Sequence, residues 1–313
     1  MMEKKLLLAL DGSRNSLMAL DYVNDLFRSC PEVTLVLFHV LPLIPPIYKE
    51  EGLLDPMAQK YLVQWKKKQQ EAIEGVLKKS KDKLIKSGWP ESRVQIRAQE
   101  KRIGVARDIL FEAQKGLYDA VVIGRRGLSK AVEVFLGSVS NKVIQGAGDL
   151  PVWVVGGRII NPRILVAVDG SENAKRAVDH LSFILGSRTE EAIEILLLYV
   201  WPGLITLSGP RVIPNLSAFP IGKEKVEKRI TPFLDQCQAM LLEAGLSPSQ
   251  IKRKICMKCS DIGKAILSEA EKGGYGTIVI GRRGISKAQE FFMGSVSNKI
   301  LQQSGDKSVW IVG

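Results

Sequence analysis

GRRGLSKAVEVFLGSVSNKVI occupies residues 124–144, and GRRGISKAQEFFMGSVSNKIL occupies residues 281–301. Fifteen of the 21 aligned positions are identical. Two shorter pairs recur at nearly the same offset, LLLALDGS with ILVAVDGS and PVWVVG with SVWIVG. Self-similarity at a fixed spacing is the sequence signature of a repeated structural unit. The chain is therefore predicted to be a tandem duplication.

The chain's 313 residues are enough for two domains that each bury their own core. The segment GGRIINP, residues 156–162, joins the repeats and is too short for a free linker. We therefore predict two domains, residues 1–157 and 158–313, that pack together as an internal pair resembling a symmetric dimer. The closing strands PVWVVG and SVWIVG are the edges expected to face one another. Further assembly into a homodimer is left open.

Within each repeat, short apolar runs alternate with stretches of helical periodicity. The apolar runs of the first repeat are residues 6–10, 33–40, 94–98, 120–123 and 152–155, and helical patterns cover 13–28, 60–86, 104–116 and 138–145. Apolar strands that alternate with helices are typical of a parallel sheet covered on both faces. Each repeat is therefore predicted to be a five-stranded, parallel, doubly wound α/β domain of the Rossmann-like class.

The composition is that of a globular protein, with 45% apolar and 25% charged residues. All apolar runs are far shorter than the ~20 residues needed to cross a bilayer, so no membrane partner is expected. The start of the chain carries too short an apolar run for an export signal. With only four cysteines, Cys30, Cys237, Cys256 and Cys259, the predicted location is the reducing cytoplasm.

The net charge of +12 raises the question of a polyanionic partner. Many of the lysines lie between Lys60 and Lys86, where apolar residues also recur at helical spacing. An ordinary amphipathic helix is favoured over a helix that binds nucleic acid. A basic interaction module that binds no nucleotide remains one alternative for the whole chain.

Several small or acidic residues come directly after predicted strands. In an open parallel sheet, ligands bind beyond the carboxyl ends of the strands, where the strand order reverses. Each repeat has an aspartate after its first strand, a valine at the end of its second and a glycine after its fourth. These residues are Asp11, Val40 and Gly124 in the first repeat, and Asp169, Val200 and Gly281 in the second.

The repeated loop has the spacing Gly-x2-Gly-x9-Gly-Ser. Glycines permit positive φ and let backbone amides approach an anion, and Gly-Ser-Val-Ser opens a helix whose first amides attract negative charge. The serines can add hydroxyl donors, and the aspartate can accept from a ribose hydroxyl or a purine amine. This describes a mononucleotide site. The alternative is purely structural: turns at the glycines, an N-cap at Ser138 and an Asx turn at Asp11.

Each repeat resembles a universal stress protein (UspA-like) domain, in the branch that carries G-x2-G-x9-G-[ST] and binds nucleotide. The resemblance covers essentially the whole chain, although Ala9 and Ala167 stand where some ATP-binding members have proline. It implies a fold similar to adenine nucleotide alpha hydrolases and one ATP or AMP per domain, with Mg²⁺ able to accompany ATP. It also implies a stress-response role with an unidentified protein partner. The implied nucleotide-binding residues are Asp11, Val40, Gly124, Gly127, Gly137, Ser138, Val139 and Ser140, then Asp169, Val200, Gly281, Gly284, Gly294, Ser295, Val296 and Ser297.

Three other features compete for a role. The pairs Arg125-Arg126 and Arg282-Arg283 either reach the phosphates or are solvated loop charges. Cys256-Met257-Lys258-Cys259 is a CxxC, but it has no second CxxC and no nearby histidine, so metal or redox chemistry is the less favoured interpretation. His39 and His180 do not correspond between repeats, and neither suggests a general base.

No GxxxxGK[ST] is present, and no G-x-G-x-x-G follows a strand, which argues against a P-loop ATPase or a dinucleotide enzyme. No repeated acidic pair is placed to hold Mg²⁺ and activate water. The favoured function is therefore a nucleotide-binding regulator. The enzyme alternative is slow ATP hydrolysis or phosphate transfer in the same clefts.

Overall fold

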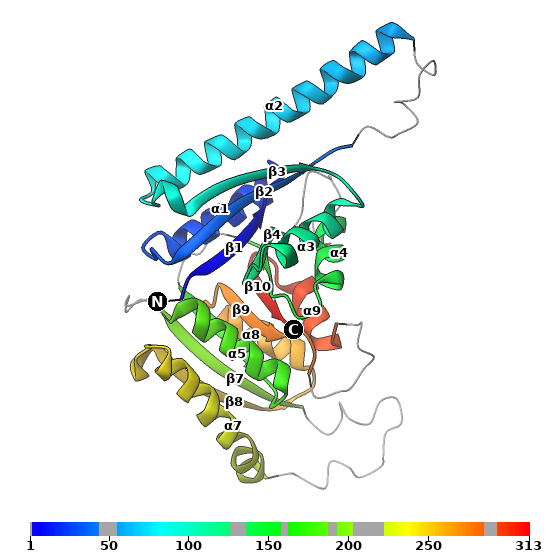
Figure 1. Cartoon of the computed structure of the whole chain (residues 1–313). Coiled ribbons are helices and arrows are strands. Elements are labelled where there is room, and N and C mark those ends of the chain that lie inside the picture. Colours follow the sequence, from blue (N-terminus) through cyan, green and yellow to red (C-terminus); the bar gives the residue numbers. More distant parts are fainter. Residues whose placement is uncertain are drawn as a thin grey trace, which may run out of the picture. The chain divides into compact units, whose positions relative to one another are not determined.

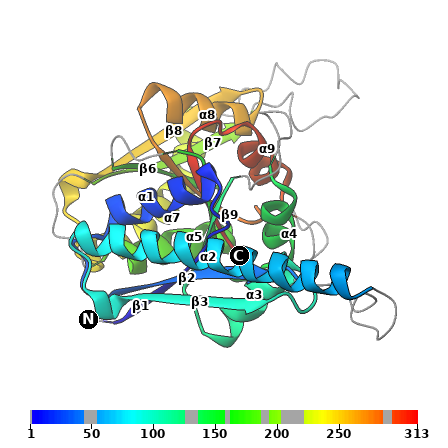
Figure 2. The same cartoon turned by 90° about the horizontal axis from the view of Figure 1, so that it is seen from above.

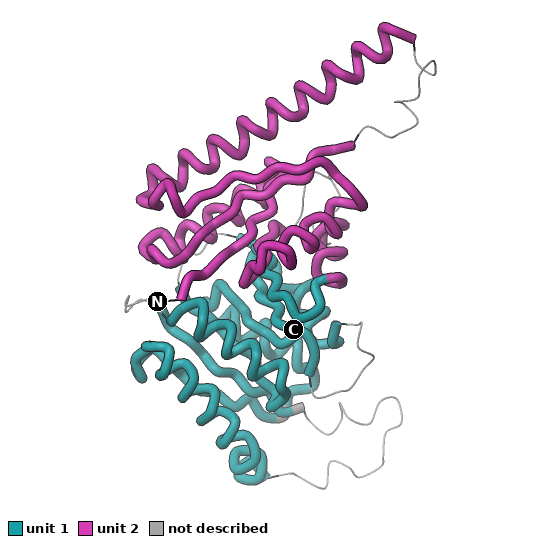
Figure 3. Tube along the Cα trace, viewed as in Figure 1, with its two compact units in different colours: residues 1, 132–135, 147–313 teal, residues 2–131, 136–146 magenta. Residues whose placement is uncertain are grey.

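The computed structural model describes residues 2–43, 55–125, 136–157, 162–186, 193–202, 222–284 and 293–313. They fall into two compact units, shown in Figure 3. The N-terminal unit (unit 2 in the figure) contains residues 2–125 and 136–146 apart from the gap, and the C-terminal unit (unit 1) contains the described residues from 147 onward. The division at residue 157 stays a prediction for the boundary between the sequence repeats.

The N-terminal unit is built on four parallel strands in the order β3-β2-β1-β4 (Figure 1). The strands are β1 (Lys4–Ala9), β2 (Val33–Leu41), β3 (Val94–Glu100) and β4 (Ala120–Gly124). The helices are α1 (Arg14–Phe27), α2 (Pro56–Lys86), α3 (Val105–Lys115) and α4 (Ser138–Gly146), with a 3₁₀ turn at Glu91–Arg93. Helix α1 packs against α2, and α3 packs against α4. The strand order reverses at β1, between β2 and β4.

The C-terminal unit has the strand order β5-β10-β9-β6-β7-β8. The strands are β5 (Val152–Val155), β6 (Arg163–Val168), β7 (Glu194–Pro202), β8 (Ile251–Cys259), β9 (Thr277–Gly281) and β10 (Ser308–Val312). The helices are α5 (Glu172–Leu185), α7 (Lys223–Glu243), α8 (Ile262–Lys272) and α9 (Ser295–Gln303), with a 3₁₀ turn at Pro248–Gln250. The pairs β10–β9, β9–β6, β6–β7 and β7–β8 are parallel, and the pair β5–β10 is antiparallel. The prediction of parallel α/β repeats with five strands each is confirmed.

The last strand of the first repeat, β5, belongs to the C-terminal unit because it pairs with β10. Trp153 stacks on Trp310 with ring centroids 3.8 Å apart and an interplanar angle of 3°. The Trp153 Nε1–H donates to His180 Nε2 at 3.1 Å. Burial lowers the pKa of His180 to about 3, so this ring stays neutral inside the core. The prediction that the two closing strands meet is confirmed.

The long helix α2 lies alongside β3 in both views (Figures 1 and 2). Leu77 and Leu84 are buried, which confirms the predicted amphipathic helix. Several of its lysines pair with acids on the same helix or on neighbouring elements: Lys66 with Glu100, Lys67 with Glu71, Lys81 with Glu91, and Lys83 with Asp21. Over the part of the chain that the structure describes, no helix is both long and apolar enough to span a membrane.

Candidate functional site

The aspartate after the first strand of each repeat closes a tight turn. Asp11 Oδ1 accepts a hydrogen bond from the Ser13 amide at 2.9 Å, and Asp169 Oδ1 accepts one from the Ser171 amide at 3.0 Å. Ser13 and Ser171 then cap α1 and α5 through their side chains. The Asx turn foreseen as the structural alternative is therefore present in both repeats. It engages one carboxylate oxygen and fixes where the carboxylate lies.

The helix after the repeated loop begins identically in both repeats. The Asn141 amide donates to Gly137 O at 2.8 Å, and the Asn298 amide donates to Gly294 O at 2.9 Å. These are the first intrahelical bonds, so the glycine is at the cap position and the amides of the next three residues have no carbonyl within the helix. The alternative that Ser138 is the N-cap is wrong, because Ser138 is the first helical residue. The helix starts carry partial positive charge.

A serine inside each helix start binds it to the preceding strand. Ser140 Oγ donates to Gly124 O at 2.9 Å, and Ser297 Oγ donates to Gly281 O at 2.8 Å. The predicted hydroxyl donation from these serines to a ligand is thus already directed to the protein backbone. Ser138 and Ser295, in the first turn of each helix, are exposed.

The glycine at the end of β4 and β9 is needed for close packing. A Cβ on Gly124 would lie 2.7 Å from the backbone of Asn15, and one on Gly281 would lie 2.8 Å from the backbone of Asn173. The strand ends therefore touch the starts of α1 and α5. This close packing is a structural reason for the glycine beside the ligand-binding one that the sequence pattern favoured.

The other glycines of the loop differ in their backbone conformation and in what surrounds them. Gly294 has φ −59°, so this glycine does not use the positive φ that glycine permits. Positive φ occurs instead next to the aspartate, at Gly12 (77°) and Gly170 (83°). A Cβ on Gly284 would lie 2.4 Å from Asp169 Oδ2, which places this glycine beside the carboxylate. Gly127, its counterpart in the first repeat, lies outside the described residues.

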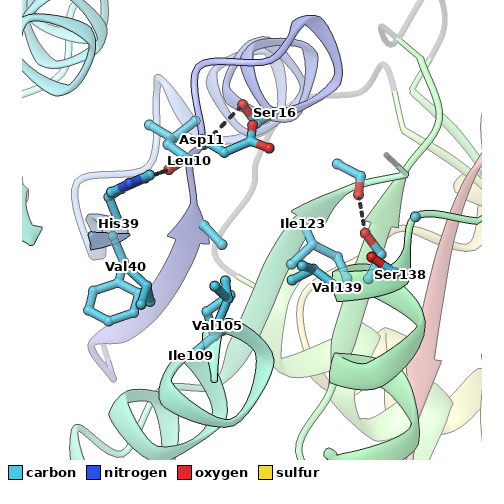
Figure 4. A pocket seen from close by; sticks show the side chains of 15 residues that line it. Leu10, Asp11, Ser16, His39, Val40, Val105, Ile109, Ile123, Ser138 and Val139 are labelled. Atoms are coloured by element: carbon cyan, nitrogen blue, oxygen red, sulfur yellow. Dashed lines mark hydrogen bonds between the residues drawn. The ribbon is translucent and has the colours of Figure 1, made fainter. Parts of the chain in front are cut away.

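The N-terminal unit has a cavity of about 220 Å³ at the carboxyl ends of β1, β2 and β4 (Figure 4). Asp11 and Ser138 lie at its polar edge, and most of the other side chains that line it are apolar. Its volume is below the ~300–1,000 Å³ typical for drug-sized ligands, so it would enclose only part of a nucleotide. The predicted residues Asp11, Val40, Gly124, Gly137, Ser138, Val139 and Ser140 all line it. The apolar wall also contains Leu10, Val105, Ile109 and Ile123, which no sequence motif indicated.

His39 also lines this cavity and was not predicted to do so. Its Nδ1 lies 2.5 Å from Leu10 O, and because a carbonyl only accepts, Nδ1 carries the proton. Burial lowers the pKa of His39, opposed by the Leu10 carbonyl and the charge of Asp11. The ring is thus neutral at pH 7, with Nε2 as an acceptor. The sequence could have indicated this role, because His39 directly precedes Val40 at the predicted end of the second strand.

The first arginine of each pair is not a solvated loop charge. Arg125 is 6% exposed and Arg282 is 4% exposed, and Arg282 Nη1 donates to Gly148 O at 3.3 Å. Burial lowers the pKa of Arg282. Within the described part of the chain, Arg283 Nε is buried and has no hydrogen-bond partner. If Gly294 carried a Cβ atom, that atom would lie 3.5 Å from the Cα of Arg283. Arg283 is therefore next to the start of α9.

Comparisons with known proteins point to one family. Both halves of the chain match the Universal stress protein family, over residues 2–156 and 161–313. Universal stress protein YxiE of Bacillus subtilis (strain 168) is 30% identical over 149 residues, which are 45% of this chain and 93% of YxiE.

Solved structures also resemble the chain over nearly its whole length. The crystal structure of a universal stress protein from Archaeoglobus fulgidus DSM 4304 has a TM-score of 0.64 and 21% identity, covering 98% of this chain and 97% of that one. A putative universal stress protein from Pseudomonas aeruginosa UCBPP-PA14 has a TM-score of 0.54 and 16% identity, covering 99% and 93%. At these identities the likeness shows a shared fold.

Proposed function

The chain belongs to the universal stress protein family, and we propose that each of its repeats binds one adenine nucleotide, ATP or AMP. The observation that carries the proposal is the matched backbone at the two helix starts. In each repeat a glycine caps the helix, a serine hydroxyl holds it to the strand end, and the next amides point outward without intrahelical partners. Anions bind at such helix starts.

In the N-terminal unit, the apolar cavity would receive the base, between Val40 and the wall formed by α3 and β4. The phosphates would then reach the amides of Ser138 and Val139, with the Ser138 hydroxyl as a further donor. Asp11, at the polar edge of the same cavity, would accept from a ribose hydroxyl.

In the C-terminal unit, Asp169, Val200 and the amides of Ser295 and Val296 would have the corresponding roles. Gly284 lies beside the Asp169 carboxylate, where a side chain would collide with it. Arg283 adds a buried N–H that lacks a hydrogen-bond partner among the described residues, next to the proposed phosphate position. A phosphate oxygen would satisfy it.

We further propose that the protein is a regulator in the stress response, working in the cytoplasm through nucleotide occupancy. All four cysteines are free thiols, which suits a reducing compartment. The β5–β10 pair, with its stacked tryptophans, would be the core of the internal domain pair. Mg²⁺ would enter with ATP.

The experiment compares two glycines that cap helices with the same backbone geometry. Gly294 has φ −59° and ψ 149°, and Gly222, at the start of α7, has φ −59° and ψ 140°. Among the residues that the structure describes, a Cβ on Gly294 would meet atoms only at 3.5 Å or beyond, and one on Gly222 would meet none within 4 Å. Alanine should therefore leave the fold intact at both positions.

Calorimetric titration of the full chain with AMP should give two sites per chain for the unmodified protein and for Gly222→Ala. The Gly294→Ala chain should lose affinity at one site by about tenfold or more, because its methyl group occupies the space of the phosphate. If Gly294→Ala and Gly222→Ala bind AMP equally well, the glycine is merely a turn residue and the proposed site is wrong. Single-turnover assays with labelled ATP separate binding from the enzyme alternative.

A further inference from the structure

The CxxC of the second repeat brings two thiols together. Cys256 Sγ and Cys259 Sγ are 2.7 Å apart, close enough for an S–H···S interaction in which either can donate. Both residues lie on β8, the edge strand of the C-terminal unit. The first repeat has no cysteine in the corresponding strand β3, whose sequence is VQIRAQE.

A β-bulge explains why these side chains meet. Residues three apart on a regular strand point to opposite faces of the sheet. Here Cys256 pairs with Val200 and Cys259 pairs with Pro202, so three steps along β8 match two along β7. The extra residue on β8 shifts the register between β7 and β8. Because of this shift, the side chain of Cys259 lies on the same face of the sheet as that of Cys256. The arrangement is therefore built by the fold and does not follow from sequence spacing.

Cys256 and Cys259 are also the most exposed of the four cysteines. Cys256 and Cys259 are partly exposed, whereas Cys30 is 6% exposed and Cys237 is fully buried. Partial burial raises the pKa of Cys259 to about 11, which keeps it a thiol at neutral pH. Small solutes can thus reach Cys256 and Cys259, while the other two cysteines are shielded.

A metal site is a poorer explanation. Structural zinc sites take four ligands. Over the described residues, no group of three or more histidine, cysteine or acidic side chains is placed to hold a metal ion. Two thiols within contact distance, without further ligands, are typical of dithiol–disulfide chemistry.

We propose that Cys256 and Cys259 form a reversible dithiol–disulfide site whose reaction partner is a small-molecule disulfide. The Cys256 thiolate attacks one sulfur of the incoming disulfide, forms a mixed disulfide and releases one thiol. Cys259 then loses its proton and attacks Cys256 Sγ, which expels the second thiol and closes the Cys256–Cys259 bond. The protein loses two hydrogens, and the small disulfide is reduced to two thiols. This goes beyond nucleotide binding and does not depend on it.

The experiment uses the full chain and a natural cleavage point. Lys258 lies between the cysteines, so trypsin separates residues 255–258 from 259–264 unless a disulfide joins them. After incubation with oxidised glutathione and alkylation of remaining thiols in denaturant, mass spectrometry should find these two peptides linked. Reduction should separate them, and both cysteines should then be alkylated.

Cys259→Ser should stop at the mixed disulfide and carry a stable glutathione adduct on Cys256. The matched control, Cys237→Ser, should form the same linked peptides as the unmodified chain. The proposal is wrong if the unmodified chain retains two alkylatable thiols at 256 and 259 after this treatment, or holds glutathione there as a lasting adduct. Because the unmodified protein gives the primary result, a variant that fails to fold would not obscure it.

Discussion

The two repeats have the same backbone at their candidate sites but different side chains around it. The turn after the first strand, the helix cap and the serine bond to the strand end agree to within 0.1 Å in their hydrogen-bond lengths. By contrast, His39 of the first repeat corresponds to Tyr199 of the second, and Gln99 beside Val40 corresponds to Cys256 beside Val200. Under the proposed function, the matching backbone groups would contact the part that two bound nucleotides share, and the differing side chains would contact the parts in which the nucleotides differ.

His39 and Tyr199 show how a single position can be tuned. The charge of Asp11 acts on His39 and that of Asp169 acts on Tyr199, so each ring lies near the aspartate of its own repeat. Burial lowers the pKa of the histidine and raises the pKa of the tyrosine, which keeps both rings neutral. We therefore expect the two repeats to share phosphate recognition and to differ in their preference for the rest of the nucleotide.

The largest effect should come from the glycine that both repeats need for packing. Gly124→Ala and Gly281→Ala each place a methyl group against the backbone of a neighbouring helix, and each should lower the free energy of unfolding by about 2–3 kcal/mol. Urea denaturation measures this. Gly104→Ala is the control, since a Cβ there would meet no atom of the described segments within 4 Å. A large loss in one repeat alone would break the structural equivalence of the two sites.

The second-largest effect should be a dependence of stability on pH that comes from His180 in the C-terminal unit. His180 is buried and neutral with a pKa of about 3, against an ordinary value of 6.5. Below pH 6.5 the unfolded chain takes up a proton that the folded chain does not, so stability should fall as pH falls toward 3. Between pH 8 and pH 5 the loss should be about 2 kcal/mol.

His180→Gln should flatten this dependence of the unfolding free energy on pH, whatever it does to stability at pH 8. His39→Gln is the matched control and should leave most of the dependence in place, because His39 is less buried than His180. An equal slope in the unmodified and His180→Gln chains would mean that the ring is protonated in the fold.

The aspartates test the shared ligand contact. Asp11→Asn and Asp169→Asn keep an oxygen that can accept from the turn amide, so the fold should be unchanged. Each should weaken nucleotide binding in its own repeat by about tenfold, because a hydrogen bond to a charged acceptor is lost. Calorimetry with AMP measures the affinity. Unchanged affinity in both variants would assign the aspartates to the turn alone.

The smallest expected effect is a change in AMP affinity on oxidation, and it should occur in the second repeat alone. Closing the Cys256–Cys259 disulfide beside Val200 should change AMP affinity in the second repeat by a few-fold and leave the first unchanged. Gly137→Ala and Gly294→Ala chains, each with one weakened site, report on the other site before and after oxidation. Equal changes in both chains would show that the disulfide acts on the whole protein.

The sequence was sufficient for the elements and for bringing most predicted residues of the first repeat to one cavity. Apolar runs and helical spacing reflect burial within one segment, which is why β1, α1 and β4 were predicted within a few residues. The partners of Ser140, Arg282 and His39 depend on segments distant in the sequence, and no local pattern encodes them. The bulge that unites Cys256 and Cys259 is likewise a property of the β7–β8 pairing.

The most direct test of the central claim is to observe the helix-start amides themselves. In ¹⁵N-labelled full-length protein titrated with AMP, we expect the amide resonances of Ser138, Val139, Ser295 and Val296 to be among the most strongly shifted. Asn141 and Asn298, whose amides are bonded within the helices, should shift less. Saturating AMP that leaves these four amides unmoved while it shifts resonances elsewhere would contradict the account.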